Sequence, residues 1–214
     1  MKKSPVRRAA STKRVKQSPA TKRPVPERRP MNVAFQGELG AFSEQALRQI
    51  WGDAAQPVTE RTFEDVARAV ARADVDRGVL PVHNAIVGPI EASLAAIAAH
   101  PELGVVDETT VIIRPMLLAL PGVSLRDITR VASHPAALGQ CGGFLDQHSE
   151  LATEEAWDTA GAARDLVASG DRTLAVIAGP AAAERYGLTV LVERVADRVD
   201  NLTRFVALAR QRAP

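Results

Sequence analysis

Short apolar runs alternate with helical patterns along the chain from Met31 onward. Residues 32–36 (NVAFQ) form an apolar run of strand length, and residues 37–42 (GELGAF) form a turn with two glycines. Ser43 stands where an N-cap would begin a helix that reaches about Trp51. The first part of the pattern therefore predicts a buried strand, a glycine-containing turn and a helix.

A second strand and helix follow directly. Residues 58–61 are expected to form a short strand. Thr62, with Asp65 three residues later, has the form of a capping box, and Phe63 and Val66 lie on one face of the helix that would begin there. The pattern therefore places a strand-to-helix turn at residues 61–62.

The rest of the chain continues this alternation. Further strands are expected over residues 78–82, 103–120, 128–133, 152–157, 174–178, 188–195 and 202–209. Further helices are expected over about 90–99, after Pro135 at position N1, over 159–169, and over 180–186 before Gly187. Such alternation predicts an α/β fold with parallel sheets, in which strand-to-helix turns present backbone N–H groups to a small anion.

Charge divides the chain into two unlike parts. The 214 residues carry 27 lysines and arginines against 25 acidic residues, a net charge of +2, and the isoelectric point is about 9.0. Residues 1–30 hold 11 of the basic residues and one acid, Glu27, which gives +10. Residues 31–214 then hold 16 basic and 24 acidic residues, which gives −8. The sequence therefore predicts an acidic domain behind a basic leader.

Composition excludes several classes of protein. One cysteine cannot build a disulfide scaffold or a cysteine-rich zinc site. The longest apolar stretch, residues 111–120, is interrupted by Arg114 and Pro115, so no membrane span is expected. We therefore expect a soluble chain.

The leader, residues 1–30, contains no Phe, Trp, Tyr, Leu or Ile and is expected to be disordered. Three interpretations are open: a polyanion-binding tail, a targeting segment, or a dispensable extension that precedes a start at Met31. A targeting segment is disfavoured because the leader has no repeating apolar face and no secretory apolar core. We favour the dispensable extension.

Six short motifs share the spacing of a known family. They are residues 35–43 (FQGELGAFS), 80–84 (LPVHN), 133–141 (SHPAALGQC), 158–163 (DTAGAA), 186–188 (YGL) and 200–205 (DNLTRF). In this order they resemble the prephenate dehydratases and the similar arogenate dehydratases. The resemblance covers residues 31–210. Each motif alone is weak, but six in order indicate the family.

The resemblance implies a two-lobed fold of the type II periplasmic-binding-protein kind, with a cleft between mixed or parallel sheets. We expect one lobe over residues 31–108 and 195–214, the other over 109–194, and no regulatory domain. The implied activity is that of a carbon–oxygen lyase, which converts prephenate to phenylpyruvate in phenylalanine biosynthesis without metal or cofactor. We further expect a cytoplasmic homodimer or homotetramer, with no membrane or nucleic-acid partner.

The chemistry requires groups that bind two carboxylates and a hydrogen-bond donor near the departing hydroxyl. The resemblance makes Thr203 the catalytic candidate, and Arg204 offers a planar clamp for a carboxylate. The other expected substrate-binding residues are Phe205, Asn84, His83, Ala41, Phe42, Ser43, Thr159 and Ala160. Ser43 and Thr159 have a second interpretation as helix N-caps. His134 is expected to be a hydrogen-bonded turn residue, and Cys141 a small core residue.

Three motifs depart from the family pattern. Ala41 stands where many members have threonine, although the arogenate branch resembles this form. His83 and Ala85 stand where the family has glutamate and serine, and Ala136 replaces a glutamine. Two alternative explanations are open for His83: an altered substrate preference, or a loss of activity. Three functions therefore stay open: a prephenate dehydratase, an arogenate dehydratase, or a non-catalytic binding module for a small carboxylate.

Overall fold

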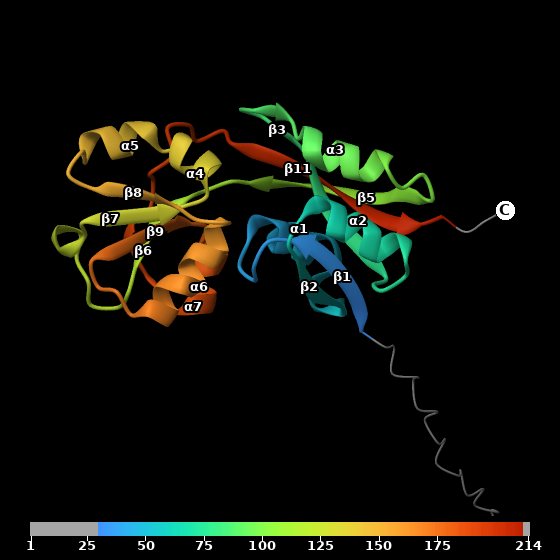
Figure 1. Cartoon of the computed structure of the whole chain (residues 1–214), viewed down its shortest axis with the longest axis horizontal. Coiled ribbons are helices and arrows are strands. Elements are labelled where there is room, and N and C mark those ends of the chain that lie inside the picture. Colours follow the sequence, from blue (N-terminus) through green and yellow to red (C-terminus); the bar gives the residue numbers. More distant parts are fainter. Residues whose placement is uncertain (1–29, 212–214) are drawn as a thin grey trace, which may run out of the picture.

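The computed structural model describes residues 30–211 and contains two α/β lobes that lie side by side (Figure 1). All of the leader but Pro30, and with it the predicted disorder, lies outside the described residues. Two segments cross between the lobes, one after β5 (Leu103–Ile112) and one before β11 (Leu202–Arg210). The predicted two-lobed α/β class is confirmed.

The first lobe is built on a mixed sheet with the strand order β2-β1-β3-β11-β5, and β4 pairs with β3. Besides β5 and β11, its strands are β1 (Met31–Gln36), β2 (Ala55–Glu60), β3 (Arg77–Asn84) and β4 (Gly88–Pro89). β1 pairs in parallel with β2 and β3, whereas β11 runs antiparallel to both β3 and β5. The returning strand β11 therefore sits inside the first sheet although it comes last in the chain.

Three helices cover the two faces of the first sheet. They are α1 (Phe42–Trp51), α2 (Phe63–Ala71) and α3 (Glu91–Ala98). Successive strand residues point to opposite faces, so Val33 and Phe35 pack toward α1 while Ala34 packs toward α2. Because both faces are covered, the central strands are apolar throughout rather than alternating.

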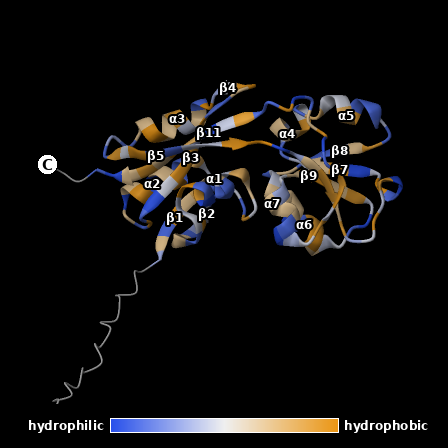
Figure 2. Cartoon of the chain, turned by 180° about the vertical axis from the view of Figure 1, so that it is seen from behind, coloured by the Kyte–Doolittle hydropathy of each residue, from blue (hydrophilic) through white to orange (hydrophobic). Residues whose placement is uncertain are grey.

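The second lobe holds a sheet of order β10-β6-β9-β7-β8. Its strands are β6 (Met116–Ala119), β7 (Arg130–Ser133), β8 (Ala152–Glu155), β9 (Leu174–Ala178) and β10 (Thr189–Val192). Its helices are α4 (Pro135–Gly139), α5 (Gly142–Gln147), α6 (Thr159–Ser169) and α7 (Pro180–Tyr186). Within β9, Val176 packs on the α6 and α7 side and Ile177 on the α4 and α5 side. Figure 2 shows β9 as a largely hydrophobic strand between these layers.

Local signals predicted most element boundaries. Thr62 and Asp65 form the expected capping box, Pro135 lies at the first helical position, and Gly187 ends α7 in the left-handed conformation. The predicted strand over 103–120 is two strands, because residues 113–115 leave the first sheet and enter the second lobe. β5 belongs to the first sheet as far as Ile112, and Val195 packs in the core of the second lobe. The crossings therefore lie later than the expected boundaries at 108 and 194.

The predicted N-cap at Ser43 is wrong. α1 begins at Phe42, and its N-cap Ala41 has no capping side chain. Gly37 and Gly40 have φ angles of +116° and +96°, which turn the chain two residues earlier than expected. The Glu44 carboxylate accepts the N–H of Gly40, in the turn before the helix, at 2.7 Å.

The two lobes are packed together through the loop between β1 and α1. A core cluster is continuous from Phe35 of the first lobe to Val176 of the second. The Tyr186 hydroxyl donates to the carbonyl of Leu39 at 2.9 Å, and a β-carbon on Gly40 would lie 3.0 Å from the α-carbon of Ala182. The cleft therefore has one closely packed side.

No helix within residues 30–211 has the length and apolar character required to cross a bilayer.

Candidate active site

A cavity of about 620 Å³ lies between the lobes, within the range of about 300–1,000 Å³ that is typical of small-molecule sites. Its polar lining includes Gln36, Ser43, Arg61, Thr62, Asn84, His134, Gln140, Asp158, Thr159 and Thr203. Its apolar lining includes Gly37, Ala41, Phe42, Phe63, Val87, Ile90, Ile113, Ala136, Ala137 and Trp157. Both lobes contribute, so the cavity exists only when the two lobes are together.

Thr203 lies at the end of a buried hydrogen-bond network. The Asn84 amide nitrogen donates to the Thr203 hydroxyl oxygen at 2.8 Å and to the Asn201 side-chain oxygen at 2.7 Å. The Asn84 oxygen accepts the backbone N–H groups of Ile86 at 2.9 Å and Val87 at 3.1 Å. Both ends of this amide are therefore fixed, and the exposed fraction of Thr203 is only 6%.

The network has a chemical consequence for Thr203. Its oxygen accepts one hydrogen bond, and within residues 30–211 its proton has no acceptor. A hydroxyl held in this way presents its proton to the cavity. Gln140 of the second lobe extends the network, because its side-chain oxygen accepts from Asn201 at 2.8 Å. The orientation of Thr203 therefore depends on residues from both lobes.

Two helix N-termini from opposite lobes meet at the cavity. Ala41, Phe42 and Ser43 begin α1, and Asp158 and Thr159 begin α6. The first N–H groups of a helix have no partner inside the helix and carry partial positive charge. The N-terminus of α1, a helix of ten residues whose N-cap Ala41 carries no charge, is a positive end suited to an anion. The N-terminus of α6, a helix of eleven residues, also carries the Asp158 carboxylate.

Asp158 caps α6 and joins the lobes. Its carboxylate accepts the N–H of Gly161 in its own helix and the N–H of Glu38 in the first lobe, the latter at 2.7 Å. Glu38 in turn pairs with Arg164 of α6. Burial raises the pKa of Asp158, although the two N–H donors oppose this shift. Asp158 is therefore the N-cap of α6, and Thr159, the first helical residue, is not.

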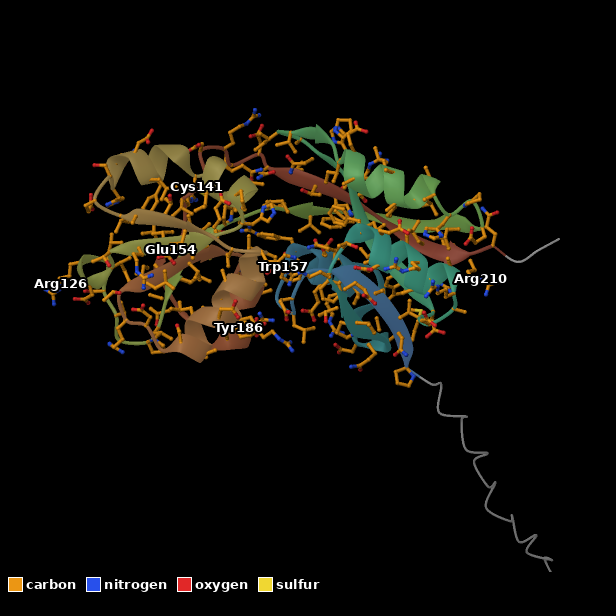
Figure 3. The ribbon with its side chains drawn as sticks, viewed as in Figure 1. Arg126, Cys141, Glu154, Trp157, Tyr186 and Arg210 are labelled. Carbon is orange, nitrogen blue, oxygen red and sulfur yellow. The ribbon has the colours of Figure 1, made fainter. Side chains whose placement is uncertain are left out.

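Arg61 and Trp157 approach each other across the mouth of the cavity. The Arg61 guanidinium carbon lies 4.3 Å from the centroid of the Trp157 ring. Arg61 directly follows β2 of the first lobe, and Trp157 precedes α6 of the second. Figure 3 shows Trp157 at the junction of the two lobes. Neither residue was among the site residues expected from the sequence.

The structure brings six of the ten expected site residues to the cavity: Thr203, Asn84, Ala41, Phe42, Ser43 and Thr159. The remaining four do not line it. Phe205 and Ala160 are core residues with 3% and 0% exposure, because the chain turns their side chains into the shared cluster.

Arg204 and His83 lie on the opposite face from Thr203 and Asn84. The four residues pair across β11 and β3, Thr203 with Asn84 and Arg204 with His83. Neighbouring strand residues alternate in direction, so the pair that follows a buried pair is exposed. The Arg204 guanidinium lies 3.4 Å from Glu108 at the surface. The expected carboxylate clamp is therefore not at the cavity, and His83 adds no charge there.

His134 is a turn residue, as expected. Its Nδ1 accepts the N–H of Ala136 at 3.1 Å, which makes it the N-cap of α4. In the neutral imidazole the proton is then on Nε2. Cys141 is fully buried, and burial raises the pKa of its thiol to about 12, so it belongs to the core as expected.

A second cavity, of about 650 Å³, lies on the other side of the lobe junction. It is lined by Gly40, Glu44, Gln45, Arg48, Ala181, Glu184, Arg185 and Tyr186. It contains no member of the Thr203 network, and its charges are two acids and two arginines. The cavity at Thr203 is therefore the better candidate for an anionic substrate.

Sequence reasoning missed Arg61, Trp157, Asp158 and Gln140 as cavity residues. One signal was present: Arg61 lies at a strand-to-helix turn after β2, and β2 pairs in parallel with β1, whose own turn lines the cavity. The ends of parallel strands meet at one edge of a sheet, which is the usual ligand edge. Trp157 had no such signal, because it comes from the other lobe.

The fold and the cavity define a class: a two-lobed α/β protein with a cavity that both lobes line. Residues 33–213 match the family described as prephenate dehydratase. The chain therefore belongs to the prephenate dehydratase family.

Known proteins with similar sequences and structures are consistent with this family. The chain is 38% identical over 181 residues to a protein of Arabidopsis thaliana named arogenate dehydratase/prephenate dehydratase 2, chloroplastic, covering 85% of this chain and 47% of the relative. The chain spans about half the length of the curated relatives it matches.

Two solved structures share the fold over most of the chain. A prephenate dehydratase from Arthrobacter aurescens, solved in complex with L-Phe, is 33% identical with a TM-score of 0.77, covering 85% of this chain and 61% of that one. A protein titled GqqA, described as a novel type of quorum quenching acylase, is 31% identical with a TM-score of 0.73, covering 86% and 65%. The same fold is thus found in proteins described by different activities.

Proposed function

We propose that the chain catalyses the decarboxylating dehydration of prephenate to phenylpyruvate. The Thr203 hydroxyl supports this proposal most directly, because it is buried, fixed by Asn84, and has its proton directed to a cavity of suitable size. The N-terminus of α1 and Arg61 add positive charge for a dianion. Membership of the prephenate dehydratase family agrees with this chemistry.

In the proposed reaction the bond between the ring and its carboxylate breaks, and carbon dioxide leaves. The electron pair moves into the ring, which becomes aromatic as the bond to the hydroxyl oxygen breaks. The hydroxyl departs with one proton as water, so the dianion becomes the monoanion phenylpyruvate. Thr203 donates a hydrogen bond to the departing oxygen, and the proton is supplied by solvent because a threonine hydroxyl is a weak acid. One such oriented donor contributes about 10²- to 10³-fold in rate.

The test is to incubate the purified full chain with prephenate and to measure phenylpyruvate formation. Thr203→Ala should lower kcat by about 10²- to 10³-fold, whereas Thr203→Ser keeps a hydroxyl and should retain more activity. Thr153→Ala, on the exposed edge strand β8, is the matched control. Wild-type turnover that is unchanged in Thr203→Ala would remove Thr203 from the mechanism.

Arogenate is the near alternative, and it differs in carrying an amino group where prephenate has a keto group. The similarity to relatives named as arogenate dehydratases supports this alternative. The ratio of kcat/KM values for the two substrates decides between them, because one hydrogen-bond partner is sufficient to discriminate.

A non-catalytic module that binds a small carboxylate is the second candidate, motivated by His83 and Ala85 at motif positions. Both residues are exposed and neither lines the cavity, which favours the enzyme. Ligand binding without turnover by the wild type would favour the module. His83→Glu with Ala85→Ser should change kcat little, and a large increase would indicate a weakened enzyme.

We further propose that the chain works as a homo-oligomer in the cytoplasm. Apolar Val105 and Val106 are exposed on β5, an edge strand of the first sheet, which supports association of copies. Light scattering coupled to gel filtration measures the assembly, and cell fractionation measures the location. A monomer, or recovery in another compartment, would contradict the corresponding part.

A further inference from the structure

Arg61 is the cation that the cavity contains. Among the described residues that line the cavity, it is the one lysine or arginine side chain. Within residues 30–211 its guanidinium has no carboxylate within 4 Å and no hydrogen-bond acceptor, and its printed contact is the face of Trp157. Within the part of the chain that the structure describes, no carboxylate therefore pairs with the charge of Arg61.

The contact with Trp157 leaves the binding edge of Arg61 available. A guanidinium carbon 4.3 Å from a ring centroid lies within the range of a cation–π interaction. In such a contact a guanidinium can stack its flat face on the ring. The N–H donors lie in the plane and point outward, so they can bind both oxygens of a carboxylate while the face stays on the ring. Among the described residues, Arg61 thus contacts the Trp157 ring while its N–H donors have no acceptor.

We propose that Arg61 binds the side-chain carboxylate of the substrate, positioned by Trp157 of the opposite lobe. This inference rests on the proposed function, because the substrate is taken from it. The expected clamp, Arg204, lies on the other face of β11 beside Glu108, so it cannot take this role in the observed arrangement.

The reaction favours the side-chain carboxylate of prephenate, rather than its ring carboxylate, as the group that Arg61 binds. The ring carboxylate loses its charge as carbon dioxide departs, so an arginine bound to it would stabilise the substrate more than the transition state. The side-chain carboxylate keeps its charge throughout the reaction and is still present in phenylpyruvate. A cation bound there stabilises substrate, transition state and product to a similar extent, which affects KM and leaves kcat unchanged.

The experiment compares wild type, Arg61→Met, Arg61→Lys and Trp157→Leu in the full chain. Arg126→Met is the matched control, because Arg126 is exposed at the far end of the second lobe (Figure 3). For each variant, kcat and KM for prephenate are measured, and the affinity for phenylpyruvate is measured by calorimetry. Thermal unfolding confirms that each variant is folded.

Arg61→Met should raise KM and weaken phenylpyruvate binding by similar factors of roughly 10- to 100-fold, with kcat within about twofold. Arg61→Lys should lie between wild type and Arg61→Met, because it keeps the charge and loses the fork. Trp157→Leu should weaken phenylpyruvate binding by a smaller factor than Arg61→Met. Arg126→Met should match wild type.

Different results separate failure of the inference from failure of the proposed function. Phenylpyruvate affinity that is unchanged in Arg61→Met would overturn the inference, as would a lower kcat with an unchanged KM. A wild type without turnover, whose phenylpyruvate binding nonetheless depends on Arg61, would overturn the proposed function and keep the inference. A wild type that neither turns over prephenate nor binds phenylpyruvate would overturn both.

Discussion

Replacing Asn84 with aspartate should reverse the hydrogen bond that orients Thr203. The substitution keeps the shape of the side chain and an oxygen for the N–H groups of Ile86 and Val87. It removes the two donors that reach Asn201 and the Thr203 hydroxyl oxygen. The Thr203 proton would then turn to the new carboxylate rather than to the cavity.

The magnitudes follow from these contacts. The hydrogen bond to Asn201 is lost and the one to Thr203 is reversed. One lost buried hydrogen bond is worth about 0.5–1.5 kcal/mol net, so the free energy of unfolding should fall by about this amount. The exposed fraction at position 84 is only 5%, which adds the desolvation of a charged group to this loss. Redirecting one oriented donor should lower kcat by about 10²- to 10³-fold, similar to Thr203→Ala.

The assay is a double-mutant cycle with prephenate as substrate. It compares kcat for wild type, Asn84→Asp, Thr203→Ala and the double variant. If Asn84 acts through Thr203, the double variant should be no slower than Thr203→Ala. Circular dichroism and urea unfolding measure the stability loss separately. Wild-type kcat in Asn84→Asp, or effects that multiply in the double variant, would refute the coupling.

Three further predictions concern the lobe junction and the core. Because burial raises the pKa of Asp158, the folded protein binds a proton at this carboxyl more tightly than the unfolded chain does. The unfolding free energy of wild type relative to Asp158→Asn should therefore fall as pH rises from about 4 through the raised pKa. A difference in urea titrations that stays constant with pH would contradict this. Gly40→Ala should lower stability by about 1–3 kcal/mol, because φ is +96° and the new β-carbon would lie 3.0 Å from Ala182. Gly170→Ala, at φ +66° with open space around it, should lose less in the same thermal melts. Cys141, buried with a thiol pKa of about 12, should resist alkylation at pH 8 until the chain is unfolded, and stoichiometric labelling of the native protein would be inconsistent with its burial.

Local signals predicted the elements because they act over a few residues. The Thr62 capping box, the proline at the first position of α4 and the glycine after α7 each satisfy or end backbone hydrogen bonds within one turn. The wrong N-cap prediction at Ser43 also has a local cause. Gly37 and Gly40 turn the chain before Ser43, and the Glu44 carboxylate accepts the N–H of Gly40. The order of β11 within the first sheet came only with the fold, because strand pairing joins residues far apart in sequence.

Motif residues were a less certain guide to the site. Thr203 and Arg204 are adjacent in one motif, yet strand alternation places one in the cavity and the other at the surface beside Glu108. Arg61 belongs to none of the six motifs, yet the turn after β2 brings it to the cavity. A motif thus marks a stretch of chain near the site, whereas side-chain direction decides which of its members can touch a ligand.

The sequence by itself determined the α/β class, most strands and helices, and the family, and it predicted Thr203, which the structure places at the cavity. Tertiary structure decided the electrostatics of the cavity. The acidic domain, with a net charge of −8, receives positive charge at its cleft from the N-terminus of α1 and from Arg61, while Asp158 caps α6 at the same cavity. Trp157, which holds Arg61, is 96 positions away along the chain and belongs to the other lobe. Charge and cation–π interactions act through space, so only the packing of the two lobes could bring these groups together.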